Sequence, residues 1–154
     1  MEAIRAIALD VDGVLTDGGF WWGPNGEEFK RFSFLDVMGV SLGTKAGLVF
    51  ALISGEDSPL VDRFAQKMGI QHVYKGCKDK GQALRAFAAA TGIPLEVTAF
   101  MGDDVNDLSA MALAGLSAAP ANAHTSVKAV VDQVTTAAGG GGAVREIIDA
   151  LLKP

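Results

Sequence analysis

Two aspartates, separated by one residue, follow an apolar run near the N-terminus. The run from Ile4 to Leu9 leads directly into Asp10-Val11-Asp12-Gly13. Residues i and i+2 of an extended chain share a face, so Asp10 and Asp12 can point into the same small volume. Two carboxylates held that close repel each other, and burying either one alone is costly. The pair therefore predicts a bound cation, a shared proton or both; the alternative is an ordinary turn after a strand, where Asp and Gly are common.

Polar side chains follow three further segments that are predicted to reach the same edge of a sheet. They come after an apolar strand, at the start of an Ala-rich helix and after another strand: Ser54, Lys80, and the acidic group Asp103, Asp104 and Asp107. In an open α/β sheet, ligands bind outside the carboxyl ends of the strands, so these groups are expected within mutual reach. The set suits phosphoryl transfer to a carboxylate, because Asp10 is ionised at neutral pH and needs no base to activate it.

A phosphate ester is itself an anion, so the site needs positive charge. We expect Mg²⁺, which prefers oxygen ligands, together with a lysine ammonium. Zinc is not expected, since His72 and His124 lack the spacing of zinc ligands. Asp12 has a different expected role: neighbouring negative charges should raise its pKa, so that it protonates the leaving oxygen and later activates water.

Apolar, β-rich segments alternate with helical ones, which predicts a doubly wound, Rossmann-like α/β fold with a mainly parallel sheet. The expected strands are residues 4–11, 48–54, 72–74, 97–101, 116–119 and 134–136. The expected helices are residues 36–45, 58–69, 79–92, 107–114, 126–131 and 143–152. Their predicted starts include Asp36, Ser58-Pro59 and Asp79. No linker divides the chain, so residues 1–154 are expected to form one domain.

A β-hairpin is expected at residues 19–34, around the turn signal Gly23-Pro24-Asn25-Gly26. About forty residues separate Asp12 from Ser54 and the hairpin uses many of them, so no separate cap domain is expected. Its aromatic side chains are Phe20, Trp21, Trp22, Phe29, Phe32 and Phe34. Two short strands cannot bury so many aromatics alone, which predicts a homo-oligomer in which hairpins pack together. The alternative is a hairpin folded back onto its own core.

The composition narrows the possible partners. The formal net charge of −5 argues against a nucleic-acid partner, which normally requires a basic face. No apolar stretch is long enough to cross a bilayer, so no membrane partner is expected. The single cysteine, Cys77, excludes an intramolecular disulfide and fits a reducing compartment, which predicts a cytoplasmic protein.

The order of these residues resembles the four motifs of the haloacid dehalogenase superfamily of phosphatases. The matching segments are Asp10-Val11-Asp12-Gly13-Val14-Leu15-Thr16-Asp17, Ile53-Ser54-Gly55, Lys80, and Gly102-Asp103-Asp104-Val105-Asn106-Asp107. The resemblance implies that Asp10 is the nucleophile and Asp12 the general acid and base. It also implies a Mg²⁺ site formed by Asp10, the backbone carbonyl of Asp12, and Asp103.

Further roles follow from the same resemblance. Ser54 and Lys80 would hold the phosphoryl group, although Lys75 and Lys78 lie close to Lys80 in the sequence. The resemblance also implies supporting partners behind the metal ligands: Asp104 and Asp107. The alternative for these two aspartates is a charged start to a helix, which the helix dipole favours.

The capless, hairpin-bearing arrangement is similar to the subgroup that contains 3-deoxy-D-manno-octulosonate (KDO) 8-phosphate phosphatases. This similarity implies a 3-deoxy-2-keto sugar acid phosphate as substrate and a homotetramer whose neighbouring subunits shape the site. The residues expected to contact the substrate are Thr16, Gly55, Glu56, Lys67 and Arg145. For Arg145 two roles remain open, since it can meet a substrate carboxylate or cap the glycine loop at 139–142.

Two departures leave the substrate open between eight-carbon and nine-carbon acids. The subgroup usually has Arg or Lys where this chain has Glu56, and it often has Arg-Asp-Gly where this chain has Leu35-Asp36-Val37. Glu56 together with Lys67 is closer to relatives that act on 9-phosphates of 2-keto-3-deoxynononate or sialic acid.

Two other functions are alternatives to an enzyme. A receiver-type signalling domain would need an aspartate at the middle strand, where Ile53-Ser54-Gly55-Glu56 stands, and an idle scaffold would not need Asp10, Asp12, Lys80 and Asp103.

Overall fold

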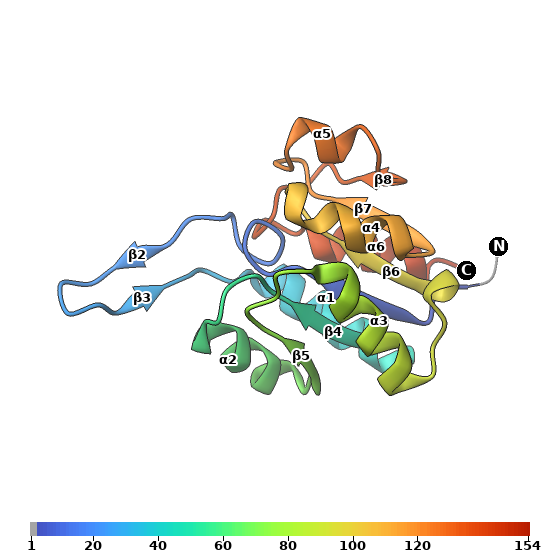
Figure 1. Cartoon of the computed structure of the whole chain (residues 1–154), viewed down its shortest axis with the longest axis horizontal. Helices are drawn as coiled ribbons and strands as arrows, with labels where there is room; N and C mark the ends of the chain where they lie inside the picture. Colours follow the sequence, from blue (N-terminus) through green and yellow to red (C-terminus); the bar gives the residue numbers. More distant parts are fainter. Residues whose placement is uncertain (1–2) are drawn as a thin grey trace.

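A parallel sheet forms the centre of the protein (Figure 1). The structure is a computed structural model and describes residues 3–154. Six strands lie in the order β5-β4-β1-β6-β7-β8, and every neighbouring pair is parallel. Their bounds are β1 Ala6–Leu9, β4 Val49–Ile53, β5 His72–Tyr74, β6 Thr98–Met101, β7 Leu116–Ala119 and β8 Gln133–Val134. The predicted doubly wound α/β fold is confirmed, and β1, which leads to Asp10, lies inside the sheet.

Helices cover both faces of this sheet. Their bounds are α1 Phe34–Lys45, α2 Pro59–Met68, α3 Lys80–Thr91, α4 Leu108–Leu113, α5 Thr125–Lys128 and α6 Ala143–Leu152. Successive strand residues face opposite layers. On β1, Ile7 and Leu9 belong to the core shared with α1, α2 and α6, whereas Ala6 and Ala8 belong to the core shared with α3, α4 and α5. Within residues 3–154 no helix is both long and apolar enough to span a membrane.

Local capping signals set the starts of two helices as predicted. Ser58 caps α2 by accepting the backbone N–H of Leu60, and Pro59 is the first helical residue. Gly69 ends that helix at φ +69°, in the left-handed region that glycine adopts without strain. Asp79 caps α3 by accepting the N–H of Gln82.

The predicted start of the first helix is wrong by two residues. Ser33 caps α1 by accepting the N–H of Leu35, and Asp36 lies buried within the first turn. The carboxylate of Asp36 instead accepts the N–H of Arg145 at 3.0 Å, at the start of α6. The cap residue of α6 is Gly142, which has no side chain to accept the N–H groups at the start of the helix. Asp36 therefore caps α6, a helix that is distant from it in the sequence.

The hairpin extends away from the sheet (Figure 1). Its paired strands, β2 Trp21–Trp22 and β3 Glu28–Phe29, make up only part of the predicted hairpin at residues 19–34. Phe32 stacks on Phe64 of α2, with ring centroids 4.8 Å apart. The other five aromatic side chains of the hairpin are exposed: Phe20, Trp21, Trp22, Phe29 and Phe34. The alternative of a hairpin folded back onto its own core is therefore wrong for all but Phe32.

Two short 3₁₀ turns account for other boundary differences. The turn η1, Leu95–Val97, delays the start of β6 by one residue. The turn η2, Val105–Asp107, precedes α4. β1, β8 and α5 are also shorter than the predicted segments at 4–11, 134–136 and 126–131.

Candidate active site

Strand ends bring the predicted catalytic side chains to one edge of the sheet. Leu9, the last residue of β1, pairs with Leu52 of β4 and Met101 of β6, so Asp10, Ser54 and Asp103 all follow within two residues of the same level. A cleft of about 410 Å³, which we call the carboxylate cleft, opens there. Its lining residues are Asp10, Asp12, Gly55, Glu56, Cys77, Lys80, Asp103, Asp104 and Asn106.

A buried lysine joins two carboxylates at the carboxylate cleft. Nζ of Lys80 lies 2.9 Å from Oδ1 of Asp10 and 2.7 Å from Oδ1 of Asp107, and all three side chains are buried. The cap at Asp79 makes Lys80 the first residue of α3 and so fixes where its side chain starts. Lys75, the neighbouring candidate, pairs with carboxylates outside the cleft. The geometry therefore favours Lys80.

Burial and the charges of neighbouring groups together set the pKa values of these side chains. It raises the pKa of Asp10 well above its usual range; the charge of Asp107 adds to this effect and Lys80 opposes it. Burial also raises the pKa of Asp103 to about 6. Burial acts to lower the pKa of Lys80, but the carboxylates of Asp10 and Asp107 together outweigh it and raise that pKa. Three carboxylates thus share one ammonium, and the cluster favours a further cation.

The donor atoms fit Mg²⁺. Carboxylate oxygens of Asp10, Asp103 and Asp107 lie within 4.8 Å of one another, and Mg²⁺ prefers such hard oxygen ligands. Both oxygens of Asp107 are already engaged. Oδ1 accepts from Lys80, and Oδ2 accepts the backbone N–H of Asp103 at 2.8 Å and of Asp104 at 3.2 Å. Asp10 and Asp103 are therefore the side chains free to hold the ion, and Asp107 fixes their surroundings.

The raised pKa of Asp103 predicts how pH and Mg²⁺ act together on stability. Its ordinary pKa is 3.8, so between about pH 4 and pH 6 the folded, metal-free chain keeps a proton that the unfolded chain has lost. This contribution to the stability of the metal-free chain therefore falls as pH rises through that range. Mg²⁺ needs the deprotonated carboxylate, so the gain in melting temperature from Mg²⁺ over a chelator should grow from pH 4 to above pH 6.

Thermal melts across this pH range, with saturating Mg²⁺ or with a chelator, measure the effect. Asp103→Asn is the matched variant, since it keeps the size of the side chain and removes the titrating group. We expect a much smaller Mg²⁺ gain in that variant at every pH. A gain that does not change with pH in the unmodified protein would contradict the assignment of Asp103 as a ligand.

The loop after β1 requires glycine at position 13. Gly13 has φ +82°, and a Cβ there would lie 2.0 Å from Oδ2 of Asp103. The buried hydroxyl of Thr16 holds this loop by accepting the N–H of Gly13 at 3.3 Å and of Gly18 at 3.2 Å. Thr16 is fully buried, so its position argues against the predicted contact with the substrate. It shapes the loop that carries Asp12 instead.

The glycine loop at 139–142 packs against this same loop. A Cβ at Gly139 would lie 2.0 Å from the backbone oxygen of Gly13, so only glycine fits there. The N–H of Gly140 donates to Val14 O at 3.2 Å. These contacts place the glycine loop beside the loop after β1 that carries Asp12. Among side chains, Arg31 donates to Gly140 O at 3.4 Å.

Asp12 forms an ion pair that was not predicted from the sequence. Nζ of Lys30, from the hairpin, lies 2.8 Å from Oδ1 of Asp12. We expected neighbouring negative charges to dominate the surroundings of Asp12, whereas the structure places an ammonium closest. The only signal in the sequence is strand periodicity, which puts Lys30 on the face opposite Phe29. That signal does not identify a partner.

Most of the remaining predicted site residues lie in, at or beneath the carboxylate cleft. Gly55 and Glu56 line the carboxylate cleft, and the buried hydroxyl of Ser54 accepts the N–H of Glu56 at 3.1 Å beneath it. Asp104 is exposed at the cleft and caps η2 by accepting the N–H of Val105, so the helix-start alternative describes its contact. Asp107 has the supporting contacts described above.

Two predicted substrate contacts lie elsewhere in the single chain. Lys67 lines a separate hollow of about 370 Å³ between the hairpin and α2. Nε of Arg145 donates to both carboxylate oxygens of Asp149, at 2.9 and 3.0 Å, and does not cap the glycine loop. Within one chain, neither side chain is among those that line the carboxylate cleft.

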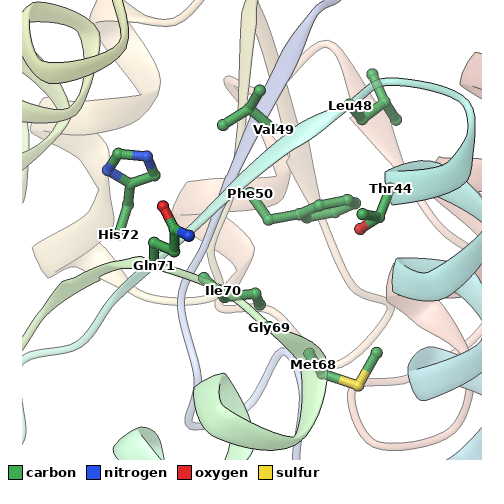
Figure 2. Close-up of a pocket in the computed structure, with 9 residues that line it drawn as sticks. All are labelled: Thr44, Leu48, Val49, Phe50, Met68, Gly69, Ile70, Gln71 and His72. Carbon is green, nitrogen blue, oxygen red and sulfur yellow. The ribbon is translucent and has the colours of Figure 1, made fainter.

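A smaller hollow lies at the opposite edge of the sheet. Figure 2 shows its lining, which comes from the start of β4, with Leu48 and Val49, and from the start of β5, with Gln71 and His72. Its volume is about 170 Å³, and its nine lining residues include no carboxylate, lysine or arginine. It therefore lacks the charged groups that distinguish the carboxylate cleft.

Comparison with known proteins agrees with this geometry. The sequence profile of the haloacid dehalogenase-like hydrolases matches residues 48–148. The 3-deoxy-D-manno-octulosonate 8-phosphate phosphatase of Escherichia coli (strain K12) is 41% identical over 151 residues, which cover 98% of this chain and 80% of that protein. The protein of the same name from Haemophilus influenzae is 39% identical over 153 residues, covering 99% of this chain and 85% of that protein.

Solved structures show the same likeness. A 3-deoxy-D-manno-octulosonate 8-phosphate phosphatase from Moraxella catarrhalis, in complex with magnesium, phosphate and KDO, matches with a TM-score of 0.94 and 39% identity over 97% of this chain and 86% of that chain. The cobalt-bound phosphatase from Haemophilus influenzae matches with a TM-score of 0.93 and 40% identity, covering 97% of this chain and 87% of that chain. Metal-bound phosphatases thus share the fold described above.

Proposed function

Because this chain belongs to the haloacid dehalogenase-like hydrolase family, we propose that it is a Mg²⁺-dependent phosphatase that hydrolyses KDO 8-phosphate. The observation that carries the proposal is the position of Asp10. It is buried at the end of an inner strand, 2.9 Å from the ammonium of Lys80, and one of its oxygens lies within 4.8 Å of an oxygen of Asp103. A carboxylate so placed can attack a phosphoryl group whose charge its neighbours offset.

The reaction has two halves. In the first, a carboxylate oxygen of Asp10 attacks phosphorus, the bond from phosphorus to the ester oxygen breaks, and Asp12 gives that oxygen a proton. In the second, Asp12 takes a proton from water, whose oxygen attacks phosphorus and breaks its bond to Asp10. The products are the free sugar acid and inorganic phosphate, and Asp12 has regained its proton.

The other residues offset the negative charge of the nucleophile and the phosphoryl group and orient that group. When bound by Asp10, Asp103 and the backbone carbonyl of Asp12, Mg²⁺ supplies positive charge that offsets the nucleophile and the phosphoryl oxygens. Lys80 adds a buried ammonium beside Asp10. Ser54 and Gly55 follow β4 and orient the phosphoryl group from the side of that strand.

A panel of phosphorylated sugar acids tests the proposal. Phosphate release is measured with Mg²⁺ or with a chelator, on the 8-phosphate of KDO and on the 9-phosphates of 2-keto-3-deoxynononate and N-acetylneuraminate. We expect Mg²⁺-dependent release with the highest kcat/KM for the eight-carbon acid. Absence of Mg²⁺-dependent release from every ester, including an aryl phosphate, would favour the idle scaffold.

One observation favours the nine-carbon acids as a second candidate. Glu56, where the eight-carbon enzymes usually carry a cation, lines the carboxylate cleft and also an adjoining hollow under the hairpin. A carboxylate there disfavours an anionic group of the substrate nearby. If Glu56 selects the substrate, Glu56→Arg should shift the ratio of kcat/KM values toward the eight-carbon acid. An unchanged ratio would exclude Glu56 as the selector.

We also propose a homotetramer in which hairpins pack together and neighbours complete the site. Trp21 and Trp22 are 60% and 72% exposed, and Phe29 is 57% exposed, on a hairpin that projects from the body. Exposed aromatic patches of this kind usually mark interfaces. Lys67 and Arg145, which lie outside the cleft of their own chain, are then candidates for a neighbour's site.

The hairpin aromatics should control assembly. A buried aromatic side chain contributes about 150–250 Å² to an interface, so the double variant Trp21→Ser with Trp22→Ser should lower the mass measured by light scattering below that of four chains. Val130→Ser is the control, because Val130 is an apolar side chain with similar exposure, 66%, and lies just after α5, outside the hairpin. A mass of four chains in the double variant would contradict the proposed interface.

Finally, we propose a cytoplasmic location. The basis is composition alone: Cys77 is a free thiol, and reducing compartments preserve such thiols. Fractionation of the producing cell, followed by detection of the chain, tests it directly.

A further inference from the structure

The hairpin brings a second buried lysine to the acidic residues. Nζ of Lys30 lies 2.8 Å from Oδ1 of Asp12 and 3.7 Å from Oε2 of Glu28. Only 3% of the Lys30 side chain is exposed, close to the 2% of Lys80. Lysine is almost never buried to this extent without a charged partner. The nearest partner is Asp12, which the proposed function makes the proton donor.

This ion pair stands where two hollows meet. The carboxylate cleft includes Asp12 and Glu56, and both residues also line a second hollow of about 320 Å³. The other residues of this hairpin hollow are Gly18, Phe20, Trp22, Glu28 and Lys30. With a phosphoryl group beside Asp10 and Lys80 in the first hollow, the hairpin hollow offers space for the rest of the substrate past the Asp12–Lys30 pair. In that pose the bond that breaks lies at this boundary.

We propose that Lys30 is a positioning residue for Asp12. Its ammonium holds Oδ1 of the carboxylate, and among residues 3–154 no hydrogen bond engages Oδ2. Oδ2 is therefore the oxygen that carries the proton to the leaving oxygen and receives one from water in the second half of the reaction. This inference rests on the proposed function, because it assigns to Lys30 the orientation of that function's acid and base.

The geometry matters because proton transfer is sensitive to position. Asp12 has about a third of its side chain exposed, so packing alone does not fix its carboxylate. An error of about 1 Å in such a group can cost about 10²-fold in rate. Lys30 comes from a different element than Asp12, and its buried stem gives the carboxylate a fixed contact that the loop itself does not supply.

Two other roles for Lys30 make different predictions. A lysine that neutralises the phosphoryl group would act on every phosphate ester, and so would a lysine needed only for folding. A lysine that orients the proton donor acts only where the leaving oxygen needs a proton. The alkoxide of a sugar phosphate needs one, whereas the nitrophenolate of nitrophenyl phosphate is stable without it.

The test compares these two esters in the full-length protein with Mg²⁺. For Lys30→Met we expect kcat/KM to fall about 10²-fold on KDO 8-phosphate and less than about threefold on nitrophenyl phosphate. The constant kcat/KM reports the steps up to release of the alcohol, which include the proton transfer from Asp12. Lys30→Arg, which keeps the cation, should recover part of the loss. Lys75→Met is the control, since it removes a lysine paired with Asp57 and Asp62 outside the cleft, and should leave both values unchanged.

The ratio of the two kcat/KM values, measured on one preparation, does not depend on the fraction of folded protein. An equal fall on both esters would overturn the proposal in favour of a phosphoryl or folding role, and no fall on either would overturn it outright. Failure of the proposed function looks different. In that case the unmodified protein shows no Mg²⁺-dependent release from either ester.

Discussion

Asp10→Asn should lower phosphate release by at least about 10⁴-fold and leave the fold intact. An amide oxygen lacks the negative charge of the nucleophile, and Asn cannot form the aspartyl-phosphate. Phosphate release from KDO 8-phosphate and from an aryl phosphate measures the loss. Asp62→Asn is the matched control, because Asp62 pairs with Lys75 outside the carboxylate cleft. It should retain full turnover.

The same substitution should change the free energy of unfolding little, because it leaves no buried charge without a partner. Lys80 keeps its 2.7 Å contact with Asp107, so one buried cation still faces one buried anion. Burial opposes ionisation of Asp10 and raises its pKa, and Asn removes that penalty. The amide oxygen can still accept the N–H of Val11, which the carboxylate accepts at 2.7 Å.

We therefore expect the free energy of unfolding of metal-free Asp10→Asn to stay within about 1 kcal/mol of the unmodified protein, measured by urea denaturation. The increase in melting temperature caused by Mg²⁺ should shrink strongly, because a ligand is lost. Turnover within tenfold of the unmodified protein would remove Asp10 from the role of nucleophile. A loss of several kcal/mol would instead give it a structural role.

Those parts of the site that depend on local signals were predictable from the sequence. A parallel sheet brings strand ends to one edge, so the order of Asp10, Ser54 and Asp103 along the chain was enough to place them together. Lys80 was predictable for a related reason. Asp79 is a strong N-cap, which fixes the first residue of α3 and therefore the base of the lysine side chain.

Contacts between distant segments were not predictable. Asp36 has the composition of an N-cap for its own helix, yet its carboxylate accepts the N–H of Arg145 because α6 begins beside it without a capping side chain. The contact between Lys30 and Asp12 depends on how the hairpin is oriented relative to the central sheet. Thr16 lies within the first motif, and only the path of the loop shows that its hydroxyl faces inward. Each case depends on tertiary packing, which sequence spacing does not encode.

Unlike Asp10→Asn, Lys80→Met should cause large losses in both stability and turnover. It leaves Asp10 and Asp107 buried with no ammonium between them. Removing one partner of a buried ionic cluster typically costs about 3–5 kcal/mol. Turnover should fall by at least about 10²-fold, because the phosphoryl group also loses a preorganised cation. Lys75→Met should cost less than about 1 kcal/mol, since its carboxylate partners are largely exposed.

The pH dependence of the unfolding free energy of Lys80→Met distinguishes the loss of the lysine charge from a change in packing. In the variant, buried Asp10 loses the ammonium that opposes the rise of its pKa, so it keeps a proton more readily than it does in the unfolded chain, and stability falls as pH rises. The difference in unfolding free energy from the unmodified protein should therefore be larger at pH 8 than at pH 5. A loss caused only by the shape of methionine would not change with pH. Urea denaturation at the two pH values, without metal, measures both quantities.

A second substitution gives the sharper test. Adding Asp107→Asn to Lys80→Met removes one of the two buried carboxylates that have lost their ammonium, so the double variant should be more stable than Lys80→Met without recovering its turnover. Non-additivity of this kind is expected where residues share one buried cluster. If the second substitution deepens the loss instead, the contacts of Asp107 with the N–H groups of Asp103 and Asp104 matter more than its charge. The buried lysine would then stabilise the loop after β6 rather than balance the nucleophile.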